Sequence, residues 1–272
     1  DAAVLYPTIG ILWEAELADA ELSQAYCRAY NRWIADFCRP SRGRLIPIAH
    51  LSLGDPEAAA AELRRAVKDG CRGGFVVPFA WTRRPHGHPA HDPLFAAAVE
   101  LDVPIAIHPS FEPFNLRSQR FEDGHRLPLL ASATAGDGVR HAFTTFFDFA
   151  AFDRFPKLKL VILESGAGWI GYWLDRLDGV ATATYLGGRA PLRQKPSDYF
   201  RRQCWISADP DEHTIPALAA LYGGDRFFWA SDYPHPDHTG DYLEALENMA
   251  DAMPPAARIG LLGGDVRAAY RF

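Results

Sequence analysis

Short apolar runs alternate with amphipathic stretches along nearly the whole chain, and this alternation is what most constrains the fold. Each apolar run has the length of a buried parallel strand, and each amphipathic stretch is long enough to cross back over a sheet. The predicted strands are Ala3–Tyr6, Leu45–His50, Gly74–Val77, Ile105–His108, Leu158–Glu164, Cys204–Ser207 and Phe227–Ser231. The predicted helices are Asp19–Cys38, Pro56–Lys68, Pro93–Leu101, Gly138–Phe149, Ala167–Leu177, Thr214–Leu221 and Tyr242–Met249, with a last one near Gly264–Tyr270. This repeated unit predicts an α/β protein.

Seven strands, each followed by a helix, favour a (β/α)8 TIM barrel over an open doubly wound sheet. No Gly-rich phosphate loop follows any strand, so the doubly wound alternative lacks support. A closed barrel needs an eighth strand, and we expect that strand to lie before Asp1. The length of 272 residues suits one such domain. Residues 1–272 are therefore predicted to form a single barrel domain that is incomplete at its N-terminus.

Composition narrows the classes of partner. The formal net charge is −6, and no basic cluster suggests a nucleic-acid partner. No apolar run approaches the roughly 18 residues of a membrane span, and no signal peptide opens the chain. The four cysteines are scattered, which is typical of reduced core residues and favours a cytoplasmic location.

Three of the predicted strands end in a side chain that can bind a metal ion or carry a proton. An apolar, aromatic strand runs directly into Asp232, and a Pro-broken loop follows. His108 and Glu164 end two other strands in the same way. A carboxylate at the end of a buried strand is costly unless it meets a metal, a cation or several donors. Because the carboxyl ends of barrel strands form the active-site rim, this pattern predicts an enzyme.

Each of these side chains has a structural alternative. His108 is a candidate metal ligand, because neutral imidazole suits zinc and similar ions, but it could simply bond backbone at a strand end. Asp232 could bind the metal, act as a general base on metal-bound water, or belong to a turn. Glu164 could bind metal, carry a proton or pair with an arginine. Glycines follow Glu164 and precede Trp169, so backbone there can approach a ligand, and the next helix offers its N-terminus to an anion.

A long connection at Phe111–Leu127 directly follows His108 and is a candidate lid over an anionic substrate. It carries three guanidinium groups, Arg117, Arg120 and Arg126. Such groups pair with carboxylates through two hydrogen bonds at once. Trp169 and His235 are further candidate substrate contacts.

Other conspicuous side chains are interpreted as structural. The His86-Gly87-His88 pair lies in a Pro- and Gly-rich segment that we expect to be a solvated loop. His50 ends a strand and is interpreted as a satisfied core histidine. The aromatic stripe Phe143–Phe149 is expected to serve packing or a subunit interface.

Five segments in order resemble the amidohydrolase-related family of metal-dependent barrels, whose best-known type is aminocarboxymuconate semialdehyde decarboxylase. They are Tyr6-Pro7-Thr8, Ala29-Tyr30-Asn31-Arg32-Trp33, Ile107-His108-Pro109, Arg154-Phe155-Pro156-Lys157-Leu158-Lys159 and Ser231-Asp232-Tyr233-Pro234-His235. The resemblance runs from about Ala2 to Phe272 and implies one divalent ion, commonly zinc and sometimes manganese. It implies His108 as the fifth-strand ligand and Asp232 as the eighth-strand ligand, with two more ligands on a strand before Asp1. Where the family often has a catalytic histidine, this chain has Glu164.

The resemblance implies a hydrolase or carboxy-lyase that acts on a small cyclic, aromatic or unsaturated carboxylic acid. Asp232 and Glu164 are the predicted catalytic residues, and a homodimer is the expected assembly. The alternative is a barrel that has lost its metal site and serves as a binding or structural subunit. An H-x-H or E-x-H pair on an upstream strand would distinguish the two.

Overall fold

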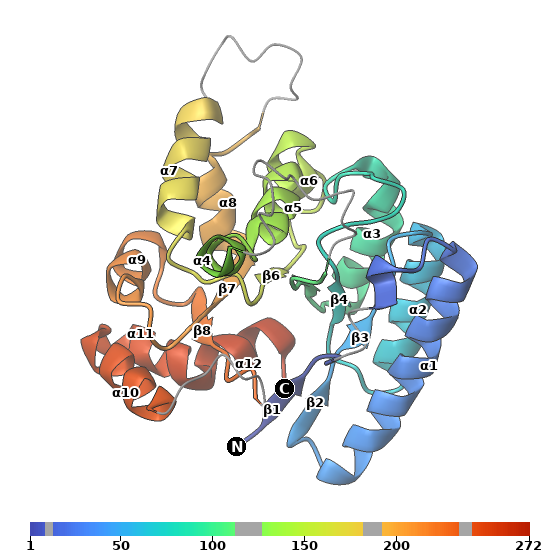
Figure 1. Ribbon diagram of the computed structural model, residues 1–272, viewed down its shortest axis with the longest axis horizontal. Helices are drawn as coiled ribbons and strands as arrows, with labels where there is room; N and C mark the ends of the chain where they lie inside the picture. The colour runs from blue at the N-terminus through green and yellow to red at the C-terminus, as the bar shows by residue number, and fades with distance from the viewer. Residues whose placement is uncertain (9–12, 112–126, 182–191, 234–240) are drawn as a thin grey trace.

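The computed structural model describes residues 1–8, 13–111, 127–181, 192–233 and 241–272 (Figure 1). Its strands are β1 (Ala3–Leu5), β2 (Leu45–Pro47), β3 (Ala49–His50), β4 (Gly74–Val76), β5 (Ile105–Ile107), β6 (Leu160–Ile162), β7 (Cys204–Ala208) and β8 (Phe227–Trp229). Its α-helices are α1 (Ala20–Cys38), α2 (Pro56–Lys68), α3 (Asp92–Leu101), α4 (Pro128–Ala133), α5 (Asp137–Asp148), α6 (Ala151–Arg154), α7 (Ile170–Ala181), α8 (Pro196–Gln203), α9 (Ile215–Tyr222), α10 (Tyr242–Ala252), α11 (Pro255–Ile259) and α12 (Asp265–Tyr270).

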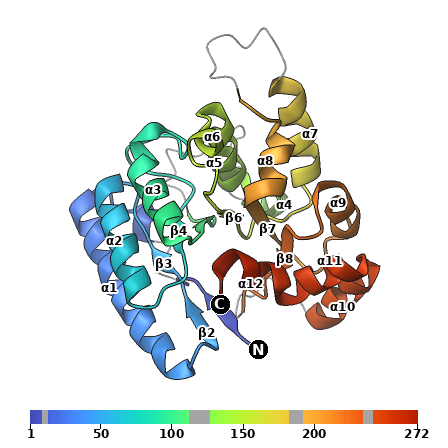
Figure 2. The same cartoon turned by 180° about the vertical axis from the view of Figure 1, so that it is seen from behind.

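All recorded strand pairs are parallel, and the strands follow one another in chain order. β3 to β8 form one sheet, and β1 pairs with β2. The predicted strand Leu45–His50 is divided in the structure into β2 and β3. Ile48, the residue between them, donates its N–H to the carbonyl of Leu5 on β1 at 3.2 Å. Helices surround the strands, and the C-terminal α12 lies beside β1 (Figures 1 and 2). This order confirms the predicted (β/α)8 barrel class. No ladder joins β8 to β1 within the described parts of the chain.

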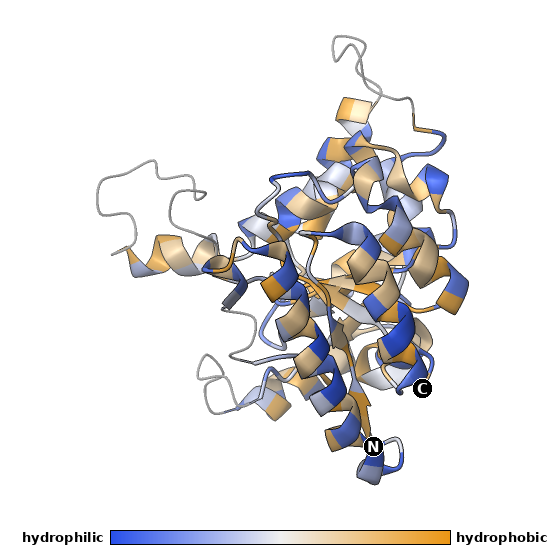
Figure 3. Cartoon of the chain, turned by 90° about the vertical axis from the view of Figure 1, so that its right-hand side faces the viewer, coloured by the Kyte–Doolittle hydropathy of each residue, from blue (hydrophilic) through white to orange (hydrophobic). Residues whose placement is uncertain are grey.

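Alternation along the strands creates two cores. One set of side chains points to the inside of the barrel, where Phe75, Ala106, Val161 and Trp205 stand side by side in register and are buried. Their neighbours along each strand point outward and pack under the helices. Figure 3 shows the apolar strands in the centre and helices that carry both hydrophilic and hydrophobic residues around them. The inner layer fills the barrel, so any site must lie at its rim.

The sequence pairs Asp55-Pro56 and Asp92-Pro93 each predict a helix start, with Asp as the N-cap and Pro at the first helical position. Asp55 caps α2 by accepting hydrogen bonds from the N–H groups of Glu57 and Ala58, both at 3.1 Å, as expected. Asp92 was wrong as a cap, because His91 precedes the helix and the Asp92 carboxylate instead binds Arg154 at 2.8 Å. The lack of periodicity around Tyr185–Arg202 predicts an irregular connection, and this prediction is wrong at Pro196–Gln203, which forms α8.

The core contains the aromatic residues of α5 and the cysteines. The aromatic stripe of α5 serves packing, because Phe143, Phe146 and Phe147 are all buried in the core. The four cysteines are buried and free. Among the helices of the described ranges, none combines the length and the apolar character that crossing a membrane requires.

Candidate active site

The carboxyl ends of β5, β6 and β8 bring the predicted site residues to one rim of the sheet. His108 directly follows β5, Glu164 follows β6, and Asp232 lies three residues beyond β8. The Nε2 atom of His108 lies 2.5 Å from Oε2 of Glu164. Asp232 is near enough for its charge to raise the pKa of His108. The sequence therefore located the strand ends correctly, and the fold brings them together.

His108 is held in an apolar setting with both ring nitrogens engaged. Its Nδ1 lies 2.7 Å from the carbonyl oxygen of Pro109, which can only accept, so Nδ1 carries a proton. The Tyr6 ring stacks 6.3 Å from the imidazole, and the Phe75 ring meets it edge-on at 5.8 Å. Burial lowers the pKa of His108, but the hydrogen bond and charge of Glu164 outweigh burial, and the pKa is raised above its ordinary value.

Both acidic residues of the site have a left-handed backbone conformation. The φ angle is +40° at Glu164 and +44° at Asp232. A non-glycine residue in this region costs about 1–3 kcal/mol and persists only where the surroundings enforce it. Strained residues of this kind gather at functional sites, and here the left-handed turn redirects the chain just after the strand. The Glu164 side chain keeps 36% exposure, so a small molecule can reach it.

The glycine-rich segment after Glu164 does bind an anion, but this anion is the carboxylate of another residue of the same chain. Glu212, which follows β7, accepts the N–H groups of Ala167 and Gly168 at 2.7–2.9 Å. Trp169, a predicted substrate contact, donates its indole N–H to the carbonyl of Gly166 at 2.8 Å. Sequence reasoning missed Glu212, although an acidic side chain just beyond a strand end was the available signal.

Donor chemistry at this rim fits a divalent ion. With Nδ1 bound to a backbone carbonyl, the imidazole of His108 is oriented to offer Nε2 to a metal, a common arrangement in metal sites. Carboxylate oxygens of Asp232 and Glu164 are suitable companions. Within the described residues no three His, Cys, Asp or Glu side chains lie close enough to hold a metal on their own. These donors thus fit part of a coordination sphere.

Four of the predicted substrate contacts cannot be placed. Arg117, Arg120, Arg126 and His235 lie outside the residues that the structure describes, as does most of the predicted lid. They stay predictions from the sequence.

The histidines interpreted as structural are buried. His50 pairs through Nε2 with Oε2 of Glu14 at 2.6 Å, and both side chains are buried, so His50 is a core histidine, but only half satisfied, because its buried Nδ1 has no partner among the described residues. The expectation that the H-x-H pair lies in a solvated loop was wrong, because His86 is buried and His88 is half-buried. Burial lowers the pKa of His86 to about 4, so His86 is neutral, and its Nε2 binds the carbonyl of Val77 at 2.9 Å.

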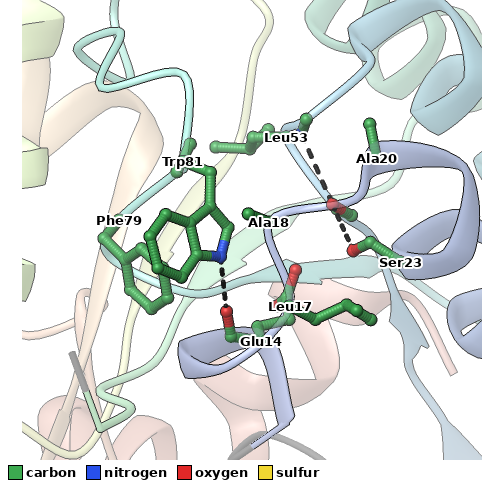
Figure 4. Close-up of a pocket in the computed structure, with 11 residues that line it drawn as sticks. Glu14, Leu17, Ala18, Ala20, Ser23, Leu53, Phe79 and Trp81 are labelled. Atoms are coloured by element: carbon green, nitrogen blue, oxygen red, sulfur yellow. Dashed lines mark hydrogen bonds between the residues drawn. The ribbon is translucent and has the colours of Figure 1, made fainter. Parts of the chain in front are cut away.

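A small pocket lies beside Glu14, on the loops that follow β1, β3 and β4. Figure 4 shows the Trp81 indole donating to the carbonyl of Glu14, at 2.9 Å, in the pocket wall. Ser23 donates to Ser52 at 2.8 Å on the other side. None of the predicted site residues lines this pocket.

Comparison with known proteins points to one family. A sequence model of the family described as amidohydrolase matches residues 10–272. The chain is 29% identical over 238 residues to gamma-resorcylate decarboxylase of Rhizobium sp. (strain MTP-10005), covering 83% of this chain and 71% of the relative. It is 30% identical over 221 residues to decarboxylase orsB of Emericella nidulans, covering 76% of this chain and 64% of the relative.

Solved structures share the fold. The 2,6-dihydroxybenzoate decarboxylase from Rhizobium superposes with a TM-score of 0.82 at 23% identity, covering 99% of this chain and 84% of that one. A 5-carboxyvanillate decarboxylase from Novosphingobium aromaticivorans, solved with manganese and a nitrobenzoic acid, gives a TM-score of 0.81 at 22% identity, covering 100% and 77%. These matches agree with the barrel order of the strands.

Proposed function

This chain belongs to the amidohydrolase family, and from that membership we propose that it is a metal-dependent carboxy-lyase for a small aromatic carboxylic acid. The observation that carries the proposal is the His108–Glu164 pair, which stands at the rim with Asp232 beside it. The curated relatives named above are decarboxylases, which favours carboxy-lyase over hydrolase chemistry.

We propose that His108 and Asp232 hold one divalent ion, zinc or manganese. Manganese is supported by the carboxyvanillate decarboxylase structure, which contains this ion. Zinc is supported by the imidazole of His108, because imidazole is a suitable zinc ligand. When bound, the ion supplies positive charge that orients and polarises a substrate carboxylate. Sequence reasoning adds Arg117, Arg120, Arg126, His235 and Trp169 as further substrate contacts, and all five belong to the proposal.

Glu164 carries the proton in this proposal. In its neutral form, Glu164 donates a proton to the ring carbon that bears the carboxylate. The carbon–carboxylate bond then breaks, carbon dioxide leaves, and the electron pair of that bond restores the aromatic ring. Glu164 is left as a carboxylate and regains a proton from water, which its partial exposure allows. Oε2 of Glu164 lies 2.5 Å from Nε2 of His108, so the proton carrier stands next to the nitrogen that would bind the ion.

Metal content and turnover together test the proposal. We expect about one divalent ion per chain by elemental analysis and, with dihydroxybenzoates and related phenolic acids, release of carbon dioxide. His108→Ala should lose the metal. Asp232→Asn should lose activity while the circular dichroism spectrum stays unchanged. Metal-free wild type would contradict the proposal and favour the inactive-barrel alternative, and full turnover by Asp232→Asn would remove that residue from the site.

We further propose a cytoplasmic homodimer, formed through an exposed stripe on α1. Four large side chains share this face and are about half exposed: Leu22 (46%), Tyr26 (51%), Trp33 (57%) and Phe37 (53%). The free, buried cysteines support the cytoplasmic location. The aromatic stripe of α5, the earlier candidate interface, lies in the core instead.

A second copy of α1 fits this stripe when it packs antiparallel. Leu22 would then face Phe37 of the other copy, and Tyr26 would face Trp33, because these positions are symmetric about the middle of the helix. Glu21 in the first turn of α1 would then lie near Arg39, which follows the last turn of α1 in the other copy. Such a contact uses the same patch on both subunits, as a two-fold dimer requires.

Light scattering on the purified protein tests the dimer. Trp33→Glu places a charge in the centre of the stripe and should give a monomer. Leu243→Glu is the matched control, because Leu243 is a 68% exposed side chain on α10, away from the stripe. A wild type that is monomeric at micromolar concentration would rule this interface out.

A further inference from the structure

We propose that Glu212 is a positioning residue, whose carboxylate fills a nest of backbone N–H groups after β6 and thereby holds Glu164 in its left-handed conformation. The inference rests on the proton-carrier role proposed for Glu164. Glu212 lies on the loop after β7, 48 positions from Glu164 in the sequence. Its hydrogen bonds among the described residues go to backbone N–H groups and not to His108 or Asp232.

The carboxylate of Glu212 is saturated with backbone donors. Ala167 donates its N–H to both oxygens, at 2.8 and 2.9 Å, and Gly168 donates to Oε1 at 2.7 Å. Asp209 donates its own backbone N–H to Oε2 at 2.9 Å. Hydrogen bonds to an ionised acceptor are roughly twice as strong as neutral ones. One side chain therefore ties the loop after β6 to the loop after β7.

Two glycines make room for this carboxylate. A Cβ on Gly166 would lie 3.2 Å from Oε1 of Glu212, and a Cβ on Gly168 would lie 3.2 Å from the same atom and 2.9 Å from Oγ1 of Thr214. Gly166 also has φ +62°, which a side chain disfavours. Successive N–H groups in such a turn form an anion-binding concavity. The glycines that suggested an external ligand thus accommodate an internal one.

Only two residues, Ser165 and Gly166, separate Glu164 from Ala167, the first donor of the nest. Ser165 packs against Gly136, where an added Cβ would lie 2.8 Å from the Ser165 Cβ. The N–H of Glu164 donates to Oγ of Ser207 at 3.1 Å, and Ser207 is buried at the end of β7. Glu164 is therefore fixed at its own N–H and, three residues later, by the nest donor Ala167. Because φ +40° is strained, releasing the nest should let Glu164 relax away from His108.

Truncation with chemical rescue tests this role. Glu212→Ala removes four non-hydrogen atoms, which is the size of acetate, and leaves the donors of Ala167 and Gly168 in place. We expect kcat to fall about 100-fold, the scale of a misplaced proton carrier, while KM changes little. Added acetate, with ionic strength held constant, should restore kcat in Glu212→Ala and raise its melting temperature. Acetate should do neither in the wild type.

Asp178→Ala is the matched control. Asp178 likewise accepts a backbone N–H, that of Ser197 at 2.9 Å, together with its hydroxyl at 2.6 Å, but at the start of α8. This variant should lose stability without a specific loss of kcat. Equal kcat losses in the two variants, or a Glu212→Ala protein whose kcat acetate does not restore, would overturn the inference.

The melting temperature separates this inference from the proposed function. If the wild type has no decarboxylase activity, the proposed function fails, but acetate must still raise the melting temperature of Glu212→Ala and not that of Asp178→Ala. No rise in that variant would overturn the nest itself. Glu212→Gln, which keeps one acceptor oxygen, should fall between wild type and Glu212→Ala in both kcat and melting temperature.

Discussion

Asp265, the first residue of α12, is a buried carboxyl group whose protonation affects stability. Only 6% of the residue is exposed, and its Oδ2 has no hydrogen-bond partner among the residues that the structure describes. Burial and the nearby charge of Asp225 raise the pKa of Asp265 to about 7, although Arg226 and the backbone of Phe227 oppose the rise. A buried acid without enough donors holds its proton.

The sign of the resulting pH dependence follows from proton counts. Between the ordinary carboxyl pKa of about 4 and the folded value of about 7, the folded chain keeps the proton that the unfolded chain has lost. The free energy of unfolding should therefore fall as pH rises through this window. Asp265→Asn should remove this decline and be more stable at pH 8 by on the order of 2 kcal/mol. Urea unfolding of both proteins from pH 4 to 8 checks this, and parallel curves would contradict it.

Glu164 allows a second prediction at the level of one residue. Glu164→Gln keeps the shape but cannot carry the proton, so we expect kcat to fall at least about 100-fold while metal content stays at the wild-type level. Elemental analysis of the same samples used for the kinetics gives both values. Equal loss of metal and rate would make Glu164 a ligand, a role that the sequence also left open.

The connection after β4 packs closely on another element, because Gly87 lies directly against α5. An added Cβ at Gly87 would overlap the backbone of Thr145, whose hydroxyl oxygen accepts the Gly87 N–H at 2.9 Å. The Gly87 carbonyl in turn accepts from Arg154 at 2.9 Å. This close approach explains why the histidine-bearing loop is buried although its composition suggested a solvated one.

Gly87→Ala should destabilise the protein by about 2–4 kcal/mol, since backbone cannot move aside as a flexible side chain can. Gly179→Ala on α7 is the control, because an added Cβ there meets none of the described residues within 4 Å. The control should be neutral or stabilising by up to about 1 kcal/mol, because alanine favours a helix more than glycine does. Thermal unfolding of both variants gives the comparison. Equal melting temperatures would show that the loop can shift.

For the whole molecule, we propose that residues 1–272 unfold as one domain. The outer core is continuous from Ile34 on α1 to Leu261 before α12, and the hydroxyl groups of Tyr6 and Tyr270 bond the two ends of the chain to each other. Calorimetry should show one transition, with a heat-capacity change of about 3–4 kcal/mol/K for a chain of 272 residues. Two separate transitions would instead divide the chain into domains.

The sequence by itself determined the strands, their order and the side chains at their ends. Apolar runs and helical periodicity are local properties, and a parallel barrel converts them into one rim, so His108, Glu164 and Asp232 could be predicted to meet. Most helices were predicted for the same reason. Among the errors, those at Asp92 and α8 lie where a contact distant in the sequence, Arg154 or Asp178, changed a local preference.

Only the tertiary structure decided which groups satisfy one another across those elements. The pairing of Glu14 with His50 spans 36 residues, and the bond from Ala167 to Glu212 spans 45. Neither has a local pattern, because a carboxylate meets its donors wherever the folded chain places them. The glycines after Glu164 signalled an anion, but the sequence could not say that the chain supplies its own. Local spacing specifies where a strand ends, whereas burial and charge pairing depend on segments that meet only after folding.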